Sequence, residues 1–91
     1  MFAVDVEKHM NWVKLRAVVD ASVYALSKYS HGKISFEEAL TEIEKAVAEI
    51  LGGEAASEVR EALSTMKGES TVNILIRIED TLVRRVAKKG G

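Results

Sequence analysis

The chain contains no proline, and glycine interrupts its 91 residues at only three places before the C-terminal end. Proline breaks helices in their interior, so its absence favours long uninterrupted helices over short strands joined by turns. The interruptions fall at residues 30–33, 51–54 and 67–70, and breaks of this kind mark turns. They divide the chain into four segments. A chain of this length is one domain, so we expect residues 1–91 to form a single helical domain.

The segment 36–51 carries the clearest helix signal. Ser35 and Glu38 stand three residues apart at its start, which is the spacing of a capping box. Apolar residues then recur at helical spacing on one face and charged residues on the other. Gly52 or Gly53 ends the helix. The next segment, 54–66, has a narrower apolar stripe and is also predicted to be helical.

The last segment allows two interpretations at its start. Val72, Ile74, Ile76 and Ile78 alternate with other residues, as they would in an edge strand over 71–78. As a helix over 70–89, however, polar and apolar residues align on opposite sides along the whole segment. The alternation stops at Ile78, so the sequence favours the helix and keeps an α+β fold as the alternative.

The first segment, 5–29, is predicted to be a long helix with two apolar stripes, and Asp5 can cap it. One stripe consists of Val6, Met10, Val13, Ala17, Ala21 and Tyr24. The other consists of Trp12, Leu15, Val19, Val23 and Leu26. The remaining helices can cover one stripe easily, whereas an exposed stripe of that length exceeds the apolar patch that a soluble monomer usually carries.

We therefore expect an all-α protein, a four-helix antiparallel bundle with a long central first helix. The stripe from Trp12 to Leu26 is assigned to an interface. Its partner would be a second copy of the chain, in a homodimer or higher homo-oligomer, or another protein of a larger complex. The alternative is that the other helices wrap the first helix on both sides. The predicted function is a non-catalytic module for protein–protein interaction and oligomerisation.

Charge is distributed unevenly, although the formal net charge is only −1. Residues 1–34 carry five basic and three acidic residues, residues 35–66 two and eight, and residues 67–91 six and three. Complementary packing of the acidic middle against the basic ends is the expected explanation. Steering of a partner into register is the alternative.

No motif in the sequence supports catalysis, a cofactor or a metal site. Cysteine is absent, which removes thiol chemistry and thiolate ligands. The two histidines, His9 and His31, have no further ligands at recognisable spacing. Carboxylate pairs such as Glu38 and Glu42 lie opposite an apolar stripe, where they are solvated. Neither a P-loop nor a nucleophile elbow is present. We expect a protein that is not an enzyme and binds no cofactor or metal.

The alternative function is accessory nucleic-acid binding by the basic C-terminal helix. Its basic residues are Arg77, Arg84, Arg85, Lys88 and Lys89. Several of them share a helix face and could contact phosphates. No aromatic residue lies among them to stack on bases, and basic residues also suit a helix C-terminus because of its dipole. Protein association therefore remains the favoured function.

The sequence also bears on location. No apolar run approaches the ~18 residues of a membrane span, and the first residues do not have the pattern of a signal peptide. Asn and Gln are scarce and Cys is absent beside abundant Glu, Lys and Arg, a composition typical of proteins from hot environments. We expect a cytoplasmic protein with no membrane partner.

Overall fold

The computed structural model describes the backbone of residues 2–90 and the side chains of residues 11–85. Four helices make up the fold: α1 (Phe2–Ser30), α2 (Phe36–Leu51), α3 (Gly53–Leu63) and α4 (Thr71–Gly90). The described backbone contains no strand. The prediction of an all-α, four-helix protein is therefore confirmed, and the strand over 71–78 is wrong because α4 is helical from Thr71 onward.

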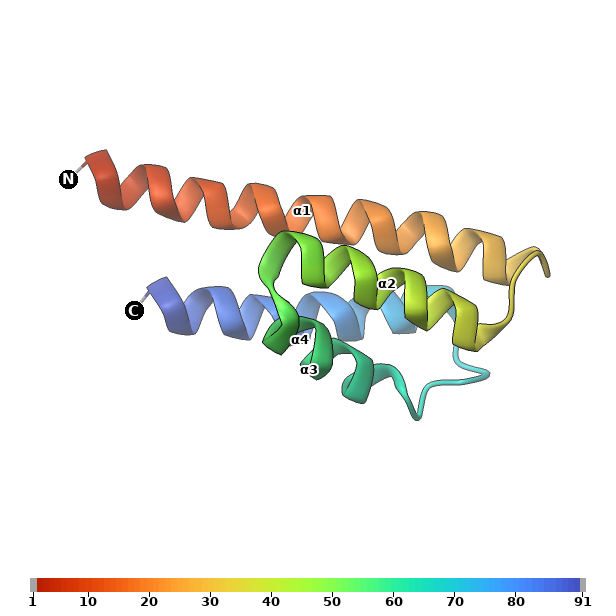
Figure 1. Cartoon of the computed structure of the whole chain (residues 1–91). Coiled ribbons are helices and arrows are strands. Elements are labelled where there is room, and N and C mark those ends of the chain that lie inside the picture. The colour runs from red at the N-terminus through yellow and green to blue at the C-terminus, as the bar shows by residue number, and fades with distance from the viewer. Residues whose placement is uncertain (1, 91) are drawn as a thin grey trace.

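Successive helices run in opposite directions, and each helix packs against two others (Figure 1). α1 lies against α2 and α4, and α3 also lies against α2 and α4, so the helices form a ring in chain order. Within the described part of the chain, α1 and α3 are diagonal to each other, and their backbones do not come close. The first helix is long, as expected, but it occupies a corner of this ring instead of its centre.

The helices differ greatly in length, and this difference shapes the molecule. At about 1.5 Å per residue, the 29 residues of α1 span much more than the 16 residues of α2 or the 11 of α3. The bundle is elongated, with extents of 47 × 21 × 19 Å. The N-terminal part of α1 and the C-terminal part of α4 continue past the turn between α2 and α3 (Figure 1). At that end the bundle narrows from four helices to two.

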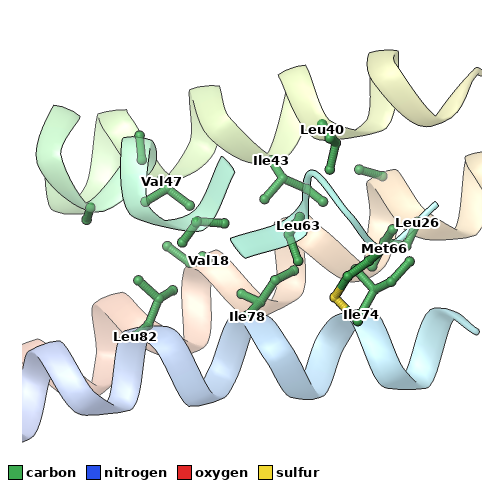
Figure 2. Close-up of a cluster of buried hydrophobic side chains, with 14 of the residues drawn as sticks. Val18, Leu26, Leu40, Ile43, Val47, Leu63, Met66, Ile74, Ile78 and Leu82 are labelled. Carbon is green, nitrogen blue, oxygen red and sulfur yellow. The ribbon is translucent and has the colours of Figure 1, made fainter. Parts of the chain in front are cut away.

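Side chains from all four helices form one apolar core (Figure 2). Its fully buried members include Val18, Leu26, Ile43, Val47, Val59, Leu63, Ile74, Ile78 and Leu82. Burying a side chain of this size contributes about 1.5–3 kcal/mol relative to leaving it in water. In α4, Ile74, Ile78 and Leu82 follow one another at intervals of four, so helical spacing and not alternation decides which residues face inward.

Local chemistry fixes both ends of α2. Ser35 Oγ accepts a hydrogen bond from the Glu38 N–H, and the Glu38 carboxylate accepts one from the Ser35 N–H, which confirms the predicted capping box. Gly52 ends the helix with a φ of 98°, a left-handed conformation that favours glycine. Its N–H donates to the Ala48 carbonyl, and its own carbonyl accepts from the Ala56 N–H, so one residue serves both α2 and α3.

Candidate interaction surface

The large apolar side chains that remain exposed lie on α1 and α4. Among the side chains of residues 11–85 these are Trp12, Val13, Val23, Tyr24, Val72 and Ile76, with exposed fractions from 44% to 67%. No side chain of α2 or α3 joins this set. The apolar residues of α2 sit on one face, whereas those of α1 are spread around the helix, so burying one face of α1 leaves others in solvent.

The structure divides the five residues predicted as interface anchors. Leu15 and Leu26 are buried in the core of the same chain, with exposed fractions of 6% and 0%. Val19 is partly buried and packs against that core. Only Trp12 and Val23 are exposed. The assignment of Leu15 and Leu26 to an intermolecular interface is therefore corrected, because α2 and α4 already cover them.

The inward face of α1 passes between the two predicted stripes, which explains this correction. Leu15, Val18, Ser22, Ala25 and Leu26 are its buried residues. Ser22 is polar, and its hydroxyl donates to the carbonyl of Val18 at 2.8 Å, so its burial leaves no unpaired group. The face opposite to this one carries Val13 and Tyr24, which the sequence assigned to the covered stripe. These two residues were missed as surface residues because periodicity alone did not choose between the stripes.

The contacts of α1 with α2 show which way its outer face points. Lys28 pairs with Glu42 of α2, and the Tyr29 ring meets the ring of Phe36 edge to face at 5.5 Å. On a helical period of 3.6 residues, Trp12 and Val23 lie on the side of α1 opposite to Lys28. Because α4 is the other neighbour of α1, these two side chains lie on the flank nearer α4.

Ion pairs with α3 orient α4 in the same way. Arg85 pairs with Glu58 of α3 at 2.7 Å, and it also approaches Glu54 at 3.8 Å. Helical spacing puts Val72 and Ile76 on the outer side of α4, away from Arg85 and α3, and both are exposed.

Trp12 and Val23 of α1 therefore lie on the same side of the bundle as Val72 and Ile76 of α4. Val13 and Tyr24 lie farther round α1, with Tyr24 beside Lys28. We call the exposed apolar faces of α1 and α4, which carry these six residues, the α1–α4 surface.

One charged pair interrupts the apolar character of α1. Arg16 and Asp20 are both exposed, and Arg16 Nε lies 3.8 Å from Asp20 Oδ1 one helical turn away. An exposed pair of this kind stabilises a helix by only about 0.3–0.5 kcal/mol. The pair lies between Val13 and Val23 along the helix.

The basic residues of α4 are partly engaged by the fold itself. Arg85 binds Glu58 and Glu54 of α3, and Arg84 donates to Asp80 of its own helix at 3.0 Å. Arg77 is exposed. The side chains of Lys88 and Lys89 lie outside the described residues. The ion pairs of Arg85 with α3, and of Lys28 with α2, join basic end segments to the acidic middle. This agrees with the predicted complementary packing of charge.

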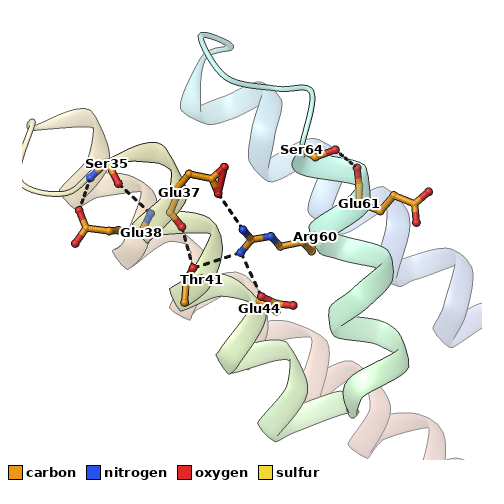
Figure 3. Close-up of polar contacts among 8 residues, drawn as sticks. All are labelled: Ser35, Glu37, Glu38, Thr41, Glu44, Arg60, Glu61 and Ser64. Carbon is orange, nitrogen blue, oxygen red and sulfur yellow. Dashed lines mark hydrogen bonds and ion pairs between the residues drawn. The ribbon is translucent and has the colours of Figure 1, made fainter.

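The acidic faces of α2 and α3 are held together by Arg60 (Figure 3). Its guanidinium donates to Glu37 at 2.9 Å and to Glu44 at 3.2 Å, and it approaches the Thr41 hydroxyl at 3.3 Å. A surface depression beside it is lined by side chains of α2 and by Arg60. Arg60 thus links two carboxylates of α2 to α3, which fits a structural role for this cluster.

No group of three His, Asp or Glu side chains within the described residues could hold a metal ion. His31 is exposed, and its Nδ1 lies 2.7 Å from the Ser27 carbonyl oxygen. A second shallow depression, lined by Tyr24, Lys28 and His31 among others, lies at the end of α1. Within the described helices, none has the length and apolar character needed to cross a membrane.

No protein-family model, curated protein or solved structure matches this chain. Its function is therefore inferred from its own sequence and geometry.

Proposed function

We propose that this chain is a helical protein–protein interaction module that self-associates through the α1–α4 surface. The observation that carries the proposal is that the exposed large apolar side chains of residues 11–85 lie on these two helices. Apolar side chains grouped on one part of a surface typically mark an interaction site. Trp12 and Tyr24 add the aromatic character that is enriched in the energetically important residues of interfaces.

Chain topology supports the same proposal. Within the described residues α1 has only two neighbours, α2 and α4, so one long face of it has no helix of the same chain against it. Covering that face removes apolar area from water at about 25 cal/mol per Å² before the cost of association is subtracted. The cytoplasmic location, the absence of catalysis and the absence of a cofactor stay predictions from the sequence.

The test is the solution mass of the full chain, measured by light scattering on a sizing column over a range of concentrations. We expect at least twice the 10.0 kDa chain mass. Val23→Asp puts a charge on the α1–α4 surface and should reduce the mass to that of the monomer. Val23 suits this purpose better than Val19, because Val19 packs against the core and its replacement would also disturb folding.

Ala48→Asp is the matched control, since Ala48 is an exposed apolar residue within the helix α2. It should leave the mass unchanged. Circular dichroism establishes that both variants keep their helices. A wild-type chain that stays monomeric at every concentration, or a folded Val23→Asp variant with unchanged mass, would contradict the proposal.

Nucleic-acid binding by α4 is the weaker second proposal. Two of its three described arginines already bind carboxylates of the chain, which reduces the positive charge offered to phosphates. The test is binding of duplex and single-stranded DNA at low salt. Affinity that falls steeply with salt, and that is lost when Arg77 and Arg84 are both changed to Glu, would favour this function. No binding at low salt would remove it.

A further inference from the structure

The residues on the outer face of α1 are arranged symmetrically along the helix, as they would be on a face that binds a second copy of the same chain. Its exposed large apolar residues are arranged about position 18: Trp12 and Val13 precede it by six and five residues, and Val23 and Tyr24 follow it by five and six. Arg16 and Asp20 stand two residues before and after the same position and carry opposite charges. The arrangement is therefore symmetric in apolar character and complementary in charge.

We infer that two copies of the chain associate with their α1 helices antiparallel, centred on position 18. This rests on the proposed function and adds the identity and orientation of the partner. A twofold interface places the same patch on both subunits, so that residue i contacts residue j and j contacts i. A patch whose two halves are complementary satisfies this condition.

Helical geometry gives the contacts. In an antiparallel pair, residues at equal distance from the centre on opposite sides lie at the same height along the axis. Arg16 then lies beside Asp20 of the second copy, and Asp20 beside its Arg16. Trp12 meets Val23 of the second copy, and Val13 meets its Tyr24. In each of these pairs the two side chains lie on the same side of the contact face, and their positions along the helix axis differ by only about 1.5 Å. Two ion pairs and four apolar contacts result.

The charges disfavour the parallel alternative. With parallel helices Arg16 would face the Arg16 of the second copy and Asp20 its Asp20, so like charges would meet at both places. Like charges in apposition disfavour a binding mode, whereas opposite charges fix the register. The existing Arg16–Asp20 contact within one helix is long, at 3.8 Å, and both side chains are exposed, so they are available to a partner.

The test uses two charge reversals, Arg16→Glu and Asp20→Arg, each in the full chain. Alone, each variant replaces two attractive contacts by two repulsive ones, and we expect its dissociation constant to rise by about tenfold at low salt. In an equimolar mixture, the glutamate introduced in one chain faces the arginine introduced in the other, and the native Asp20 faces the native Arg16. The mixed dimer should therefore form with near wild-type affinity. The loss of the contact within one helix cannot be repaired by mixing, so recovery in the mixture reports a contact between chains.

A second measurement fixes the orientation. The chain has no cysteine, so any disulfide that forms must join the introduced cysteines. A mixture of Trp12→Cys and Val23→Cys chains should form a disulfide-linked dimer on mild oxidation, whereas each variant alone should not. Like positions in the antiparallel pair are separated by at least roughly 15 Å along the axis, beyond the reach of a disulfide.

The outcomes separate this inference from the proposed function. If Val23→Asp dissociates the oligomer but the charge reversals have no effect, or the mixture shows no recovery, the surface is correct and the antiparallel register is wrong. If Trp12→Cys alone becomes linked, the register is also wrong. If the wild-type chain is monomeric at all concentrations, both the proposed self-association and the antiparallel register are contradicted.

Discussion

Lys28 Nζ lies 2.7 Å from Glu42 Oε1, an ion pair that joins the end of α1 to α2. The same ammonium group stands 4.7 Å from the centre of the Tyr24 ring. The hydrogen bond to the Glu42 side chain raises the pKa of Lys28 above its usual range, against a smaller lowering by desolvation. One lysine thus ties an exposed aromatic residue of α1 to the neighbouring helix.

We expect this pair to make stability depend on pH in the alkaline range. Because the pKa of Lys28 is raised in the folded state, its contribution is fully present below the unfolded-state pKa of about 10.4 and is lost as the pH rises through the folded-state pKa. Lys28→Met should therefore lower the Tm at neutral pH, and the difference from wild type should shrink above about pH 10.5. Thermal unfolding followed by circular dichroism between about pH 7 and pH 11.5 measures this. Lys33→Met, at an exposed lysine of the following turn, is the control. If the Tm difference from wild type depended on pH equally in the Lys28→Met and Lys33→Met variants, the prediction would be wrong.

The cap of α2 predicts a response in acid. The N–H and the hydroxyl of Ser35 both lower the pKa of Glu38, the backbone N–H having the larger effect. A carboxylate with a lowered pKa contributes stability above its unfolded-state pKa of about 4.3, and this contribution is lost as the pH falls through the folded-state pKa. Glu38→Gln should thus be less stable than wild type at neutral pH, and the two should converge below about pH 4.

Ser35→Ala removes the other half of the cap and should cost about 1 kcal/mol, as N-cap substitutions typically do. Its cost should be smaller in a Glu38→Ala background, because alanine lacks the acceptor for the reciprocal hydrogen bond of the same motif. Glu49→Gln, at an exposed position near the other end of α2, serves as the control for the pH profile. Additive effects of the two cap substitutions would show that the reciprocal hydrogen bonds do not act together.

Ile76 and Ile78 give a direct test of helical against extended structure at the start of α4. Ile78 is fully buried, whereas Ile76 is 58% exposed. Ile78→Ala should lower the free energy of unfolding by about 2–5 kcal/mol, and Ile76→Ala by less than about 0.5 kcal/mol. In a strand the two residues would share a face, and their substitutions would cost similar amounts. Urea unfolding at one fixed low protein concentration measures both, which keeps any contribution of self-association constant.

The turn between α2 and α3 distinguishes its two glycines. Gly52 has a φ of 98°, whereas Gly53 is the first residue of α3 and has no atom within 4 Å of the position a Cβ would take. Gly52→Ala should destabilise the protein by about 1 kcal/mol. Gly53→Ala should leave the stability unchanged or raise it by up to about 1 kcal/mol, since alanine restricts the unfolded chain. Thermal unfolding of the two variants compares them, and equal losses would show that Gly53 is also conformationally constrained.

The helices were predictable from the sequence because their signals are local. The capping box of Ser35 and Glu38, the terminating glycine at 52 or 53 and the four-residue spacing of Ile74 and Ile78 each involve neighbours in the chain. These features determined the helical nature of α2 and α4 and the position of the turn after α2. The complementary charge of the middle and end segments was also visible in the sequence, although the partners of Lys28 and Arg85 were not.

The candidate surface was only half predictable. Trp12 and Val23 were assigned to it and are exposed, whereas Leu15 and Leu26 were assigned to it and are buried. Both pairs recur at helical spacing on one stripe, so the sequence could not separate them. Their separation depends on the angle at which α2 and α4 meet α1, and residues distant in the chain set that angle.

The sequence by itself therefore determined that this chain forms four helices and where the turn after α2 falls, because caps, glycines and hydrophobic period act over a few residues. Only the tertiary structure decided which face of α1 is buried. α1 carries apolar residues around its circumference, so the choice depends on where α2 and α4 lie against it. That choice leaves Val13, Val23 and Tyr24 on the outside, and with them the surface on which a partner is proposed to bind.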